Sequence, residues 1–222
     1  DPFGEKIRRK FRKGIDWNSK FNLKPDPILP MPGIAKMDDT LSIFLPFSEG
    51  AGIEELQKDV CGIQLIPSVP EDVKKVFRHA KDLYIYGFFR YNFFTIAQHY
   101  AFLALESAIK NRYYQSFGKE ITLTNKKGET VKMARIDHQT VIDFCHRRKS
   151  WNVHELWING EKFAFTTREL LEWLIKKGII TEWEKRRCQR GMRLRHLMSH
   201  PTHASIFPPG YSMHALEFVA DT

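Results

Sequence analysis

Hydrophobic residues recur at helical spacing in the middle of this 222-residue chain and again toward its C-terminus. At residues 68–83, a Ser-x-x-Glu capping box, a proline suited to a first helical turn and apolar residues at helical spacing predict a helix. Gly87 is expected to interrupt it, and a second helix should run from about Phe88 to Gln115, with Gly118 as its stop. The apolar face expected for this second helix consists of Phe89, Phe93, Ile96, Tyr100 and Leu103.

Residues 119–166 follow a different pattern, in which short strand-like runs flank turn signals. Asn-Lys-Lys-Gly at 125–128 separates two such runs, and Asn-Gly at 159–160, a favoured tight-turn pair, separates two more. A short helix over about 139–147 is expected between these hairpins. The pattern therefore predicts a β insertion in a helical domain.

Helical signals then return. Thr167 is expected to cap a helix over 168–177, and a second capping box at 181–184 opens a basic helix that should extend to about residue 199. A last helix is predicted from residue 212 to the end. The apolar residues expected to bury one side of the basic helix are Trp183, Leu194, Leu197 and Met198.

Residues 1–67 show less regular patterning and are predicted to be an irregular arm. Six of the eight residues at 6–13 are basic, and the apolar run at 41–45 is expected to lie along the core as a strand or strap. Four prolines favour extended backbone between them, namely Pro25, Pro27, Pro30 and Pro32. The predicted organisation is thus an irregular arm at 1–67 and a mainly α-helical domain at 68–222, with a β insertion at about 119–166.

The charge, the cysteines and the lack of a long apolar run indicate which partners and which compartment to expect. The formal net charge of +9 favours polyanionic partners such as nucleic acid. The three cysteines are far apart in the sequence and do not form a disulfide framework, which favours a reducing compartment. No run of about 18 apolar residues is present and no signal peptide is visible, so we expect a cytoplasmic protein without a membrane partner.

An aromatic cluster occupies residues 84–94, where seven of eleven residues are Phe or Tyr. Aromatic rings stack on bases in proteins that bind single-stranded nucleic acid. Such a cluster more commonly fills a core or a dimer interface, and we expect that role here.

The strongest chemical signal is Arg195-His196-Leu197-Met198-Ser199-His200, which closes the basic helix just before Pro201. Arginine holds phosphate in a fixed two-pronged geometry, and histidine exchanges protons near neutral pH. On an ideal helix Arg195 lies about 140° from His200. Because Pro201 disfavours helical backbone at the residue before it, we expect His200 to stand at the helix exit, facing a cleft.

This arrangement resembles the HEPN superfamily, helical-bundle proteins whose motif is an arginine, four to six residues and then a histidine. Arg193 and Arg195 both fit the spacing to His200, and Arg195 is preferred because a polar residue, His196, follows it, as is usual in the family. The resemblance covers residues 70–117 and 167–221. Near the end of the second long helix, Glu106 and Lys110 are similar to polar residues that some HEPN families place beside their motif. The resemblance therefore implies an HEPN-like helical bundle.

The resemblance implies a metal-independent endoribonuclease of a toxin–antitoxin, antiviral or RNA-processing system, acting without a cofactor. His200 would transfer the proton of the ribose 2′-hydroxyl or of the leaving 5′-oxygen, and Arg195 would hold the scissile phosphate. His196 would orient the substrate or supply a second proton-transfer group. The expected substrate-binding residues are Arg190, Arg193, Glu106 and Lys110.

The products would be a 2′,3′-cyclic phosphate and a 5′-hydroxyl, and DNA would not be cut. The implied partners are RNA, a second copy of the chain and an inhibitor or antitoxin protein. Thr202 stands where toxins controlled by nucleotidyltransferases carry a tyrosine, so that form of control is not expected.

Three alternatives stay open at this point. His196, His200 and His203 have the spacing of a metal site, although no glutamate follows His196 as in the HExxH protease motif. A non-catalytic RNA-binding or assembly module would use the arginines for phosphates and His200 as a helix cap. A purely structural helix would present a solvated basic face.

Overall fold

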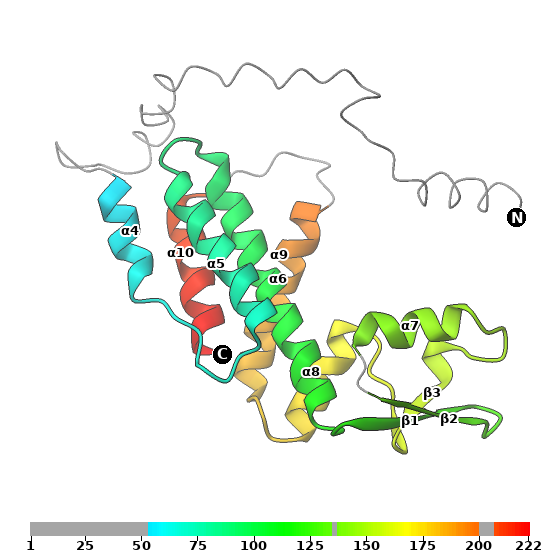
Figure 1. Ribbon diagram of the computed structural model, residues 1–222. Coiled ribbons are helices and arrows are strands. Elements are labelled where there is room, and N and C mark those ends of the chain that lie inside the picture. Colours follow the sequence, from blue (N-terminus) through cyan, green and yellow to red (C-terminus); the bar gives the residue numbers. More distant parts are fainter. Residues whose placement is uncertain (1–52, 135–136, 200–206) are drawn as a thin grey trace, which may run out of the picture. The chain divides into compact units, whose positions relative to one another are not determined.

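A long central helix, α6 (Asn92–Gln115), organises the helical part of the protein (Figure 1). The computed structural model describes residues 53–134, 137–199 and 207–222, which lie in one compact unit. An antiparallel sheet and helix α7 (His138–His146) follow α6 in the chain. The predicted mainly α fold with a β insertion is confirmed. The helices that pack against α6 are α5 (Glu71–Tyr86), α8 (Thr167–Lys176), α9 (Glu182–Ser199) and α10 (Pro209–Asp221).

Helices α5 and α6 form a hairpin whose turn depends on Gly87. A Cβ built on this glycine would lie 2.5 Å from the Phe94 ring, so a side chain there would displace a buried aromatic residue. The predicted interruption at Gly87 is confirmed. The turn extends to Tyr91, and α6 therefore begins at Asn92 rather than at Phe88.

The predicted capping box at the start of α5 is wrong. Pro70 occupies the N-cap position, and no side chain caps the helix. Ser68 lies two residues before that N-cap, whereas a capping box requires its serine at the N-cap itself. Proline cannot donate a backbone hydrogen bond, so its place at the helix start leaves one donor fewer to satisfy.

The predicted apolar face of α6 is also wrong. Ile96 is 38% exposed, whereas Phe94, Phe102, Leu105 and Tyr113 are buried. Neighbouring helices cover α6 on several sides, so its burial does not follow a single stripe. The helix ends at Gln115, and Gly118 follows in the left-handed region at φ +78°, close to the predicted stop.

The aromatic cluster contributes to the core, as expected, but not with all its rings. Tyr84, Tyr91 and Phe94 are buried, and the Phe94 ring centroid lies 5.2 Å from that of Tyr84 and 5.5 Å from that of Tyr91. Both pairs have the edge-to-face geometry that aromatic rings favour. Tyr86 is 52% exposed.

A helix that sequence patterning missed, α4 (Ile53–Cys61), lies within the predicted irregular arm. Its buried residues, Leu56 and Val60, are four apart, and the Tyr84 hydroxyl donates a hydrogen bond to the Asp59 carboxylate at 3.1 Å. The expectation of irregular structure is therefore wrong for this part of residues 1–67. The basic run at 6–13, the prolines and the strap at 41–45 lie outside the described residues.

Both predicted hairpins are present. The strand order is β2-β1-β3-β4, with β1 (Glu120–Asn125) paired to β2 (Thr130–Ala134), and β3 (Leu156–Ile158) paired to both β1 and β4 (Glu161–Lys162). Asn159 and Gly160 have φ values of 48° and 84°, as a tight type I′ turn requires. Helix α7 matches the helix predicted between the hairpins to within one residue at each end.

Two aromatic residues near the end of α6 and one histidine join the β insertion to the helices. The Tyr113 hydroxyl accepts a hydrogen bond from the Ala164 amide at 3.2 Å. His138, the first residue of α7, is buried, with Nδ1 3.3 Å from the Tyr114 hydroxyl and Nε2 2.9 Å from the Phe165 carbonyl. The insertion is thus attached to the end of α6 through polar contacts.

The C-terminal helices largely follow the predictions. Helix α8 is capped by Thr166 rather than Thr167, because Glu169, three residues after Thr166, completes a capping box. The predicted capping box of α9 is confirmed, since Thr181 and Glu184 exchange hydrogen bonds, and α9 ends at Ser199. Helix α10 begins at Pro209, three residues before the predicted start.

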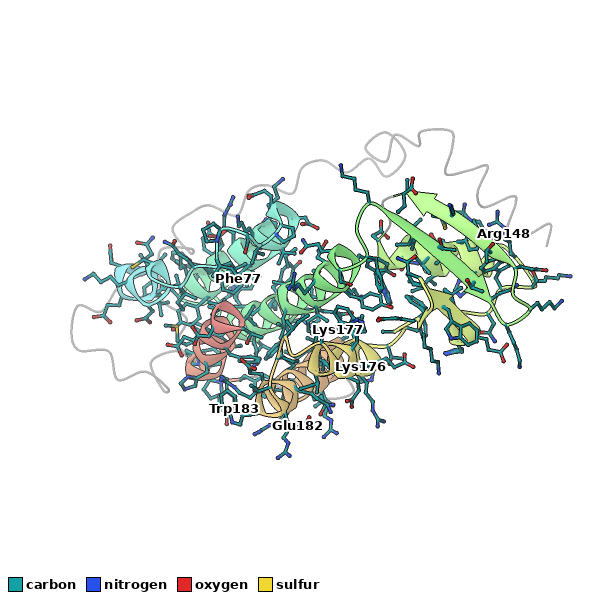
Figure 2. All side chains as sticks on the ribbon, turned by 90° about the horizontal axis from the view of Figure 1, so that it is seen from below. Phe77, Arg148, Lys176, Lys177, Glu182 and Trp183 are labelled. Atoms are coloured by element: carbon teal, nitrogen blue, oxygen red, sulfur yellow. The ribbon has the colours of Figure 1, made fainter. Side chains whose placement is uncertain are left out.

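Helix α9 packs on α6 through very little apolar surface. Of its 18 residues, Cys188 and Gly191 are buried. Trp183, at the edge of the helices in Figure 2, is 61% exposed and Leu197 is 63% exposed, so the apolar face predicted for this helix is wrong. The contact instead depends on Gly191, where an added Cβ would lie 2.2 Å from the Phe102 ring.

Gly191→Ala should destabilise the fold by about 1–3 kcal/mol, because the methyl group would push α9 away from the buried Phe102 ring. Gly210→Ala is the matched control, since Gly210 is also helical and its methyl group would meet no described atom within 4 Å beyond its chain neighbours and the adjacent backbone of its own helix. Alanine there should leave stability unchanged or raise it by up to about 1 kcal/mol. Urea denaturation measures both, and equal stabilities of the two variants would contradict the close approach.

Candidate functional site

The structure brings three of the predicted site residues together at the contact between α6 and α9. Arg195 Nη2 lies 2.7 Å from Glu106 Oε2, and Lys110 Nζ lies 2.7 Å from Glu106 Oε1. The Glu106 carboxylate is therefore shared between two cations. Its side chain is 13% exposed, while Arg195 is 28% and Lys110 34% exposed. We call these three residues the Glu106 cluster.

Local geometry explains how the Glu106 cluster forms. Glu106 and Lys110 are four residues apart on α6 and therefore share one helix face. Arg195 lies four residues after Gly191 on α9, so the close approach at Gly191 brings the arginine within reach of α6. Two cations and one carboxylate leave a net charge of +1 in the cluster.

His99 belongs to the same interface and was not predicted as a site residue. It lies on α6 seven residues, about two turns, before Glu106, and it forms a hydrogen bond with the Arg195 backbone. Burial, and then the positive charge of Arg195, lower the pKa of His99, while the backbone hydrogen bond opposes the shift. His99 Nδ1 is buried and has no hydrogen-bond partner among the residues described.

Arg193, the alternative motif arginine, points to a different part of the protein. It is exposed and lines a hollow between α8 and α9, whereas Arg195 contacts α6. Two residues along a helix correspond to a rotation of about 200°, which accounts for the separation. Arg190 and His196 are exposed as well. Of the two candidate motif arginines, Arg195 is therefore the one that pairs with Glu106, on the helix that also carries Lys110.

The predicted meeting of Arg195 with His200 lies outside the described residues, as does the alternative metal site, since His200 and His203 of its three histidines are not among them. Within the described part of the chain, no group of three or more His, Cys, Asp and Glu side chains is arranged to hold a metal ion.

Burial raises the thiol pKa of Cys145 and of Cys188, so neither is a candidate nucleophile. All three cysteines are free, as the sequence predicted, and Cys145 and Cys188 are buried. Burial raises the pKa of the Cys188 thiol to about 11, which keeps it protonated and unreactive near neutral pH.

In the described ranges, no helix combines the length and the apolar character needed to cross a membrane.

Two cationic side chains of α9, Lys185 and Arg187, are engaged by neighbouring helices. Lys185 Nζ lies 2.8 Å from the Glu172 carboxylate of α8. The Arg187 guanidinium lies 4.1 Å from the Phe218 ring centroid of α10, a cation–π contact. Lys185 and Arg187 therefore contribute to the packing of α9 on its neighbours.

Glu106→Gln should destabilise the protein by about 1–2 kcal/mol, because it leaves Arg195 and Lys110 close together without the carboxylate between them. Glu155→Gln is the control. Glu155 forms an ion pair with Lys126 on the surface, and its loss should leave the unfolding midpoint unchanged. Similar denaturation midpoints for the two variants would show that the Glu106 cluster contributes nothing beyond a surface pair.

Stability should rise with pH below about pH 6.5, because burial lowers the pKa of His138 as well as that of His99. Between the lowered native pKa values and 6.5, the unfolded chain binds more protons than the native chain, and acid therefore favours unfolding. Below the native values both states carry the protons, and the loss is complete.

His99→Gln and His138→Gln should each make the pH profile of stability shallower in that window. Urea denaturation from about pH 7 to about pH 5 measures the profiles. Variant profiles parallel to that of the parent chain would show that neither imidazole is held in its neutral form.

Comparisons with known proteins do not identify a relative of this chain. No family of known proteins, no curated protein and no solved structure matches it. The resemblance to HEPN proteins therefore stays a prediction based on the motif.

Proposed function

We propose that this domain is a metal-independent endoribonuclease that cleaves RNA by attack of the ribose 2′-hydroxyl, with Arg195 and His200 as its catalytic pair. The supporting observation is the position of Arg195. Its guanidinium is anchored to Glu106 at the α6–α9 contact, five residues before His200 in the sequence. Glu106 thus orients the arginine for a phosphate at the end of α9.

Arg195 has further N–H groups for such a phosphate, because a guanidinium carries five donors. The ion pair with Glu106 uses Nη2 and Nε is buried, which leaves Nη1 as the donor for a phosphate. The side chain is 28% exposed, and Lys110 leaves the cluster with a net positive charge. Positive charge held in place before the reaction stabilises the extra negative charge that a phosphate gains in the transition state.

In the proposed reaction, the 2′-hydroxyl loses its proton and its oxygen attacks the adjacent phosphorus. The bond from phosphorus to the 5′-oxygen breaks, and that oxygen receives a proton. The products are a 2′,3′-cyclic phosphate and a 5′-hydroxyl, and no water or oxidant is consumed. His200 performs one proton transfer, and His196, which is exposed and directly follows Arg195, performs the other or orients the RNA.

A homodimer would bring two motifs to one cleft. Leu197 supports this part of the proposal, because a large apolar side chain that is 63% exposed lies inside the motif. Cytoplasmic location, a toxin or antiviral setting, and an inhibitor or antitoxin protein stay predictions from the sequence and its family resemblance.

A second candidate is a non-catalytic RNA-binding or assembly module. The observation that favours it is the same ion pair, because Glu106 already neutralises part of the Arg195 charge. In that case the arginines would bind the backbone of RNA without positioning a phosphate for attack.

The test is incubation of the purified full chain with mixed RNA in the presence of a chelator, followed by analysis of the product ends. Cyclic phosphate and 5′-hydroxyl ends are expected. His200→Ala should reduce the rate about 100-fold or more, because proton transfer is lost. Arg195→Lys should reduce it by a similar factor, since lysine keeps the charge toward Glu106 but lacks the two-pronged geometry.

Arg78→Ala is the matched control, because this exposed arginine lies on α5 and pairs with Glu71 on the surface. It should cleave RNA as the parent chain does. Full activity in a folded His200→Ala variant would reject the proposed mechanism. RNA binding without turnover would support the non-catalytic module, and activity that a chelator abolishes and zinc restores would support the metal site.

A further inference from the structure

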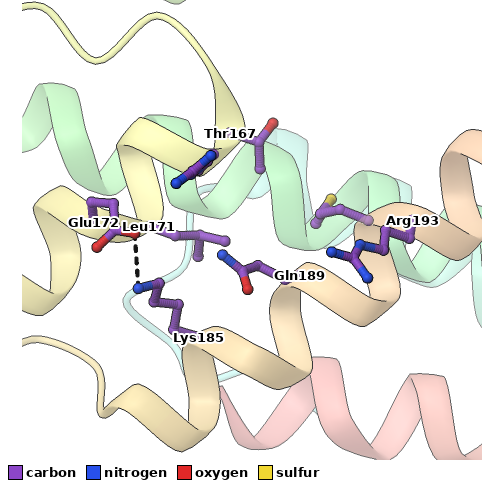
Figure 3. Close-up of a pocket in the computed structure, with 8 residues that line it drawn as sticks. Thr167, Leu171, Glu172, Lys185, Gln189 and Arg193 are labelled. Carbon is purple, nitrogen blue, oxygen red and sulfur yellow. Dashed lines mark ion pairs between the residues drawn. The ribbon is translucent and has the colours of Figure 1, made fainter.

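A second cationic feature of the protein is the hollow between α8 and α9, of about 530 Å³. From α8 it is lined by Thr167, Arg168, Leu171 and Glu172, and from α9 by Lys185, Gln189, Met192 and Arg193. Figure 3 shows Lys185, Gln189 and Arg193 projecting from α9 toward this space. We call it the α8–α9 pocket.

The charges around the α8–α9 pocket favour an anion. The carboxylate of Glu172 is paired with Lys185 at 2.8 Å, so these two lining charges balance one another. Arg168 and Arg193 are exposed, and neither forms an ion pair with any residue in the described ranges. Two guanidinium groups on opposite walls therefore contribute the excess positive charge of the pocket.

The remaining lining suits a phosphodiester. Gln189 offers an amide donor and Thr167 a hydroxyl donor, both of which bind phosphate oxygens readily. Leu171 is buried and forms an apolar wall, as does Met192. A phosphate with its attached sugar has this combination of a charged, acceptor-rich part and a less polar part.

The α8–α9 pocket also leads toward the motif. Lys185, Gln189, Arg193 and His196 follow one another at intervals of four, four and three residues, so they form one strip along α9. From Arg193 to Ser199, the last residue of α9, the helix rises about 9 Å. A nucleic-acid strand covers that distance in about three nucleotides at a stacked spacing of about 3.4 Å.

We infer that the α8–α9 pocket binds a backbone phosphate of single-stranded RNA a few nucleotides from the cleavage position, with Arg168 and Arg193 as its ligands. This assignment rests on the proposed function for its substrate, but its chemistry concerns binding and not cleavage. Because phosphate contacts do not depend on the sugar, the pocket contributes equally to RNA and to DNA of the same sequence.

The experiment measures binding of the full chain to a short mixed-sequence oligonucleotide that cannot be cleaved, uniformly 2′-O-methylated, and to single-stranded DNA of the same sequence. Arg168→Ala and Arg193→Ala should each weaken both affinities about tenfold at low salt, through loss of a charge-assisted hydrogen bond. In each variant the slope of log affinity against log salt should fall by about 0.7. Arg78→Ala, an exposed arginine on α5, should bind as the parent chain does.

The inference is overturned if the folded Arg168→Ala/Arg193→Ala double variant binds both oligonucleotides within about twofold of the parent chain. Failure of the parent chain to bind either oligonucleotide overturns it too, and a loss confined to the methylated RNA overturns the phosphate assignment. Circular dichroism confirms that each variant is folded.

The two proposals fail separately in this experiment. A parent chain that binds through these arginines but never cleaves RNA supports the pocket and rejects the nuclease. A parent chain that cleaves RNA, with a double variant that binds and cleaves alike, rejects the pocket and leaves the nuclease standing.

Discussion

The close contact between Gly191 and the Phe102 ring is the constraint on which the site depends. Helix α9 buries Cys188 and Gly191, and its other residues are half-buried or exposed, so apolar burial alone holds it weakly on α6. The absence of a side chain at Gly191 lets the two helices approach closely enough for the Arg195 guanidinium to reach the Glu106 carboxylate. Packing and ion pairing therefore reinforce one another at one short stretch of α9.

The cationic residues of α9 fall into two groups, those that contact neighbouring helices and those that are exposed. Lys185 pairs with α8, Arg187 stacks on an aromatic ring of α10, and Arg195 pairs with α6, so these three contribute to the fold. Arg186, Arg190 and Arg193 are exposed. The net positive charge of the chain thus overstates the charge that this helix would present to RNA, because three of its cations are already paired within the fold.

Features set by local chemistry were predictable from the sequence. The Asn-Gly turn at 159–160 and the Thr181–Glu184 capping box each depend on a few adjacent residues, and both form as expected. Packing between elements was not predictable in the same way. The buried faces of α6 and α9 depend on which helices cover them, and the short apolar pattern of α4 gave too little signal within a proline-rich arm. The candidate site shows the same division. Glu106 and Lys110 could be named from the sequence because their spacing and position resemble a known family. His99 could not be named, because its contact with Arg195 depends on how α9 packs on α6.

The geometry of α9 also limits how one RNA strand reaches both proposed phosphate contacts. Arg193 faces α8 and Arg195 faces α6, about 200° apart around the helix. Along its length the helix body separates these two sides. Under the proposed function, a strand that bound both arginines would pass His196, which lies near the C-terminal end of α9. Cleavage would then be expected near that end of the helix, after which the sequence places its second motif residue, His200.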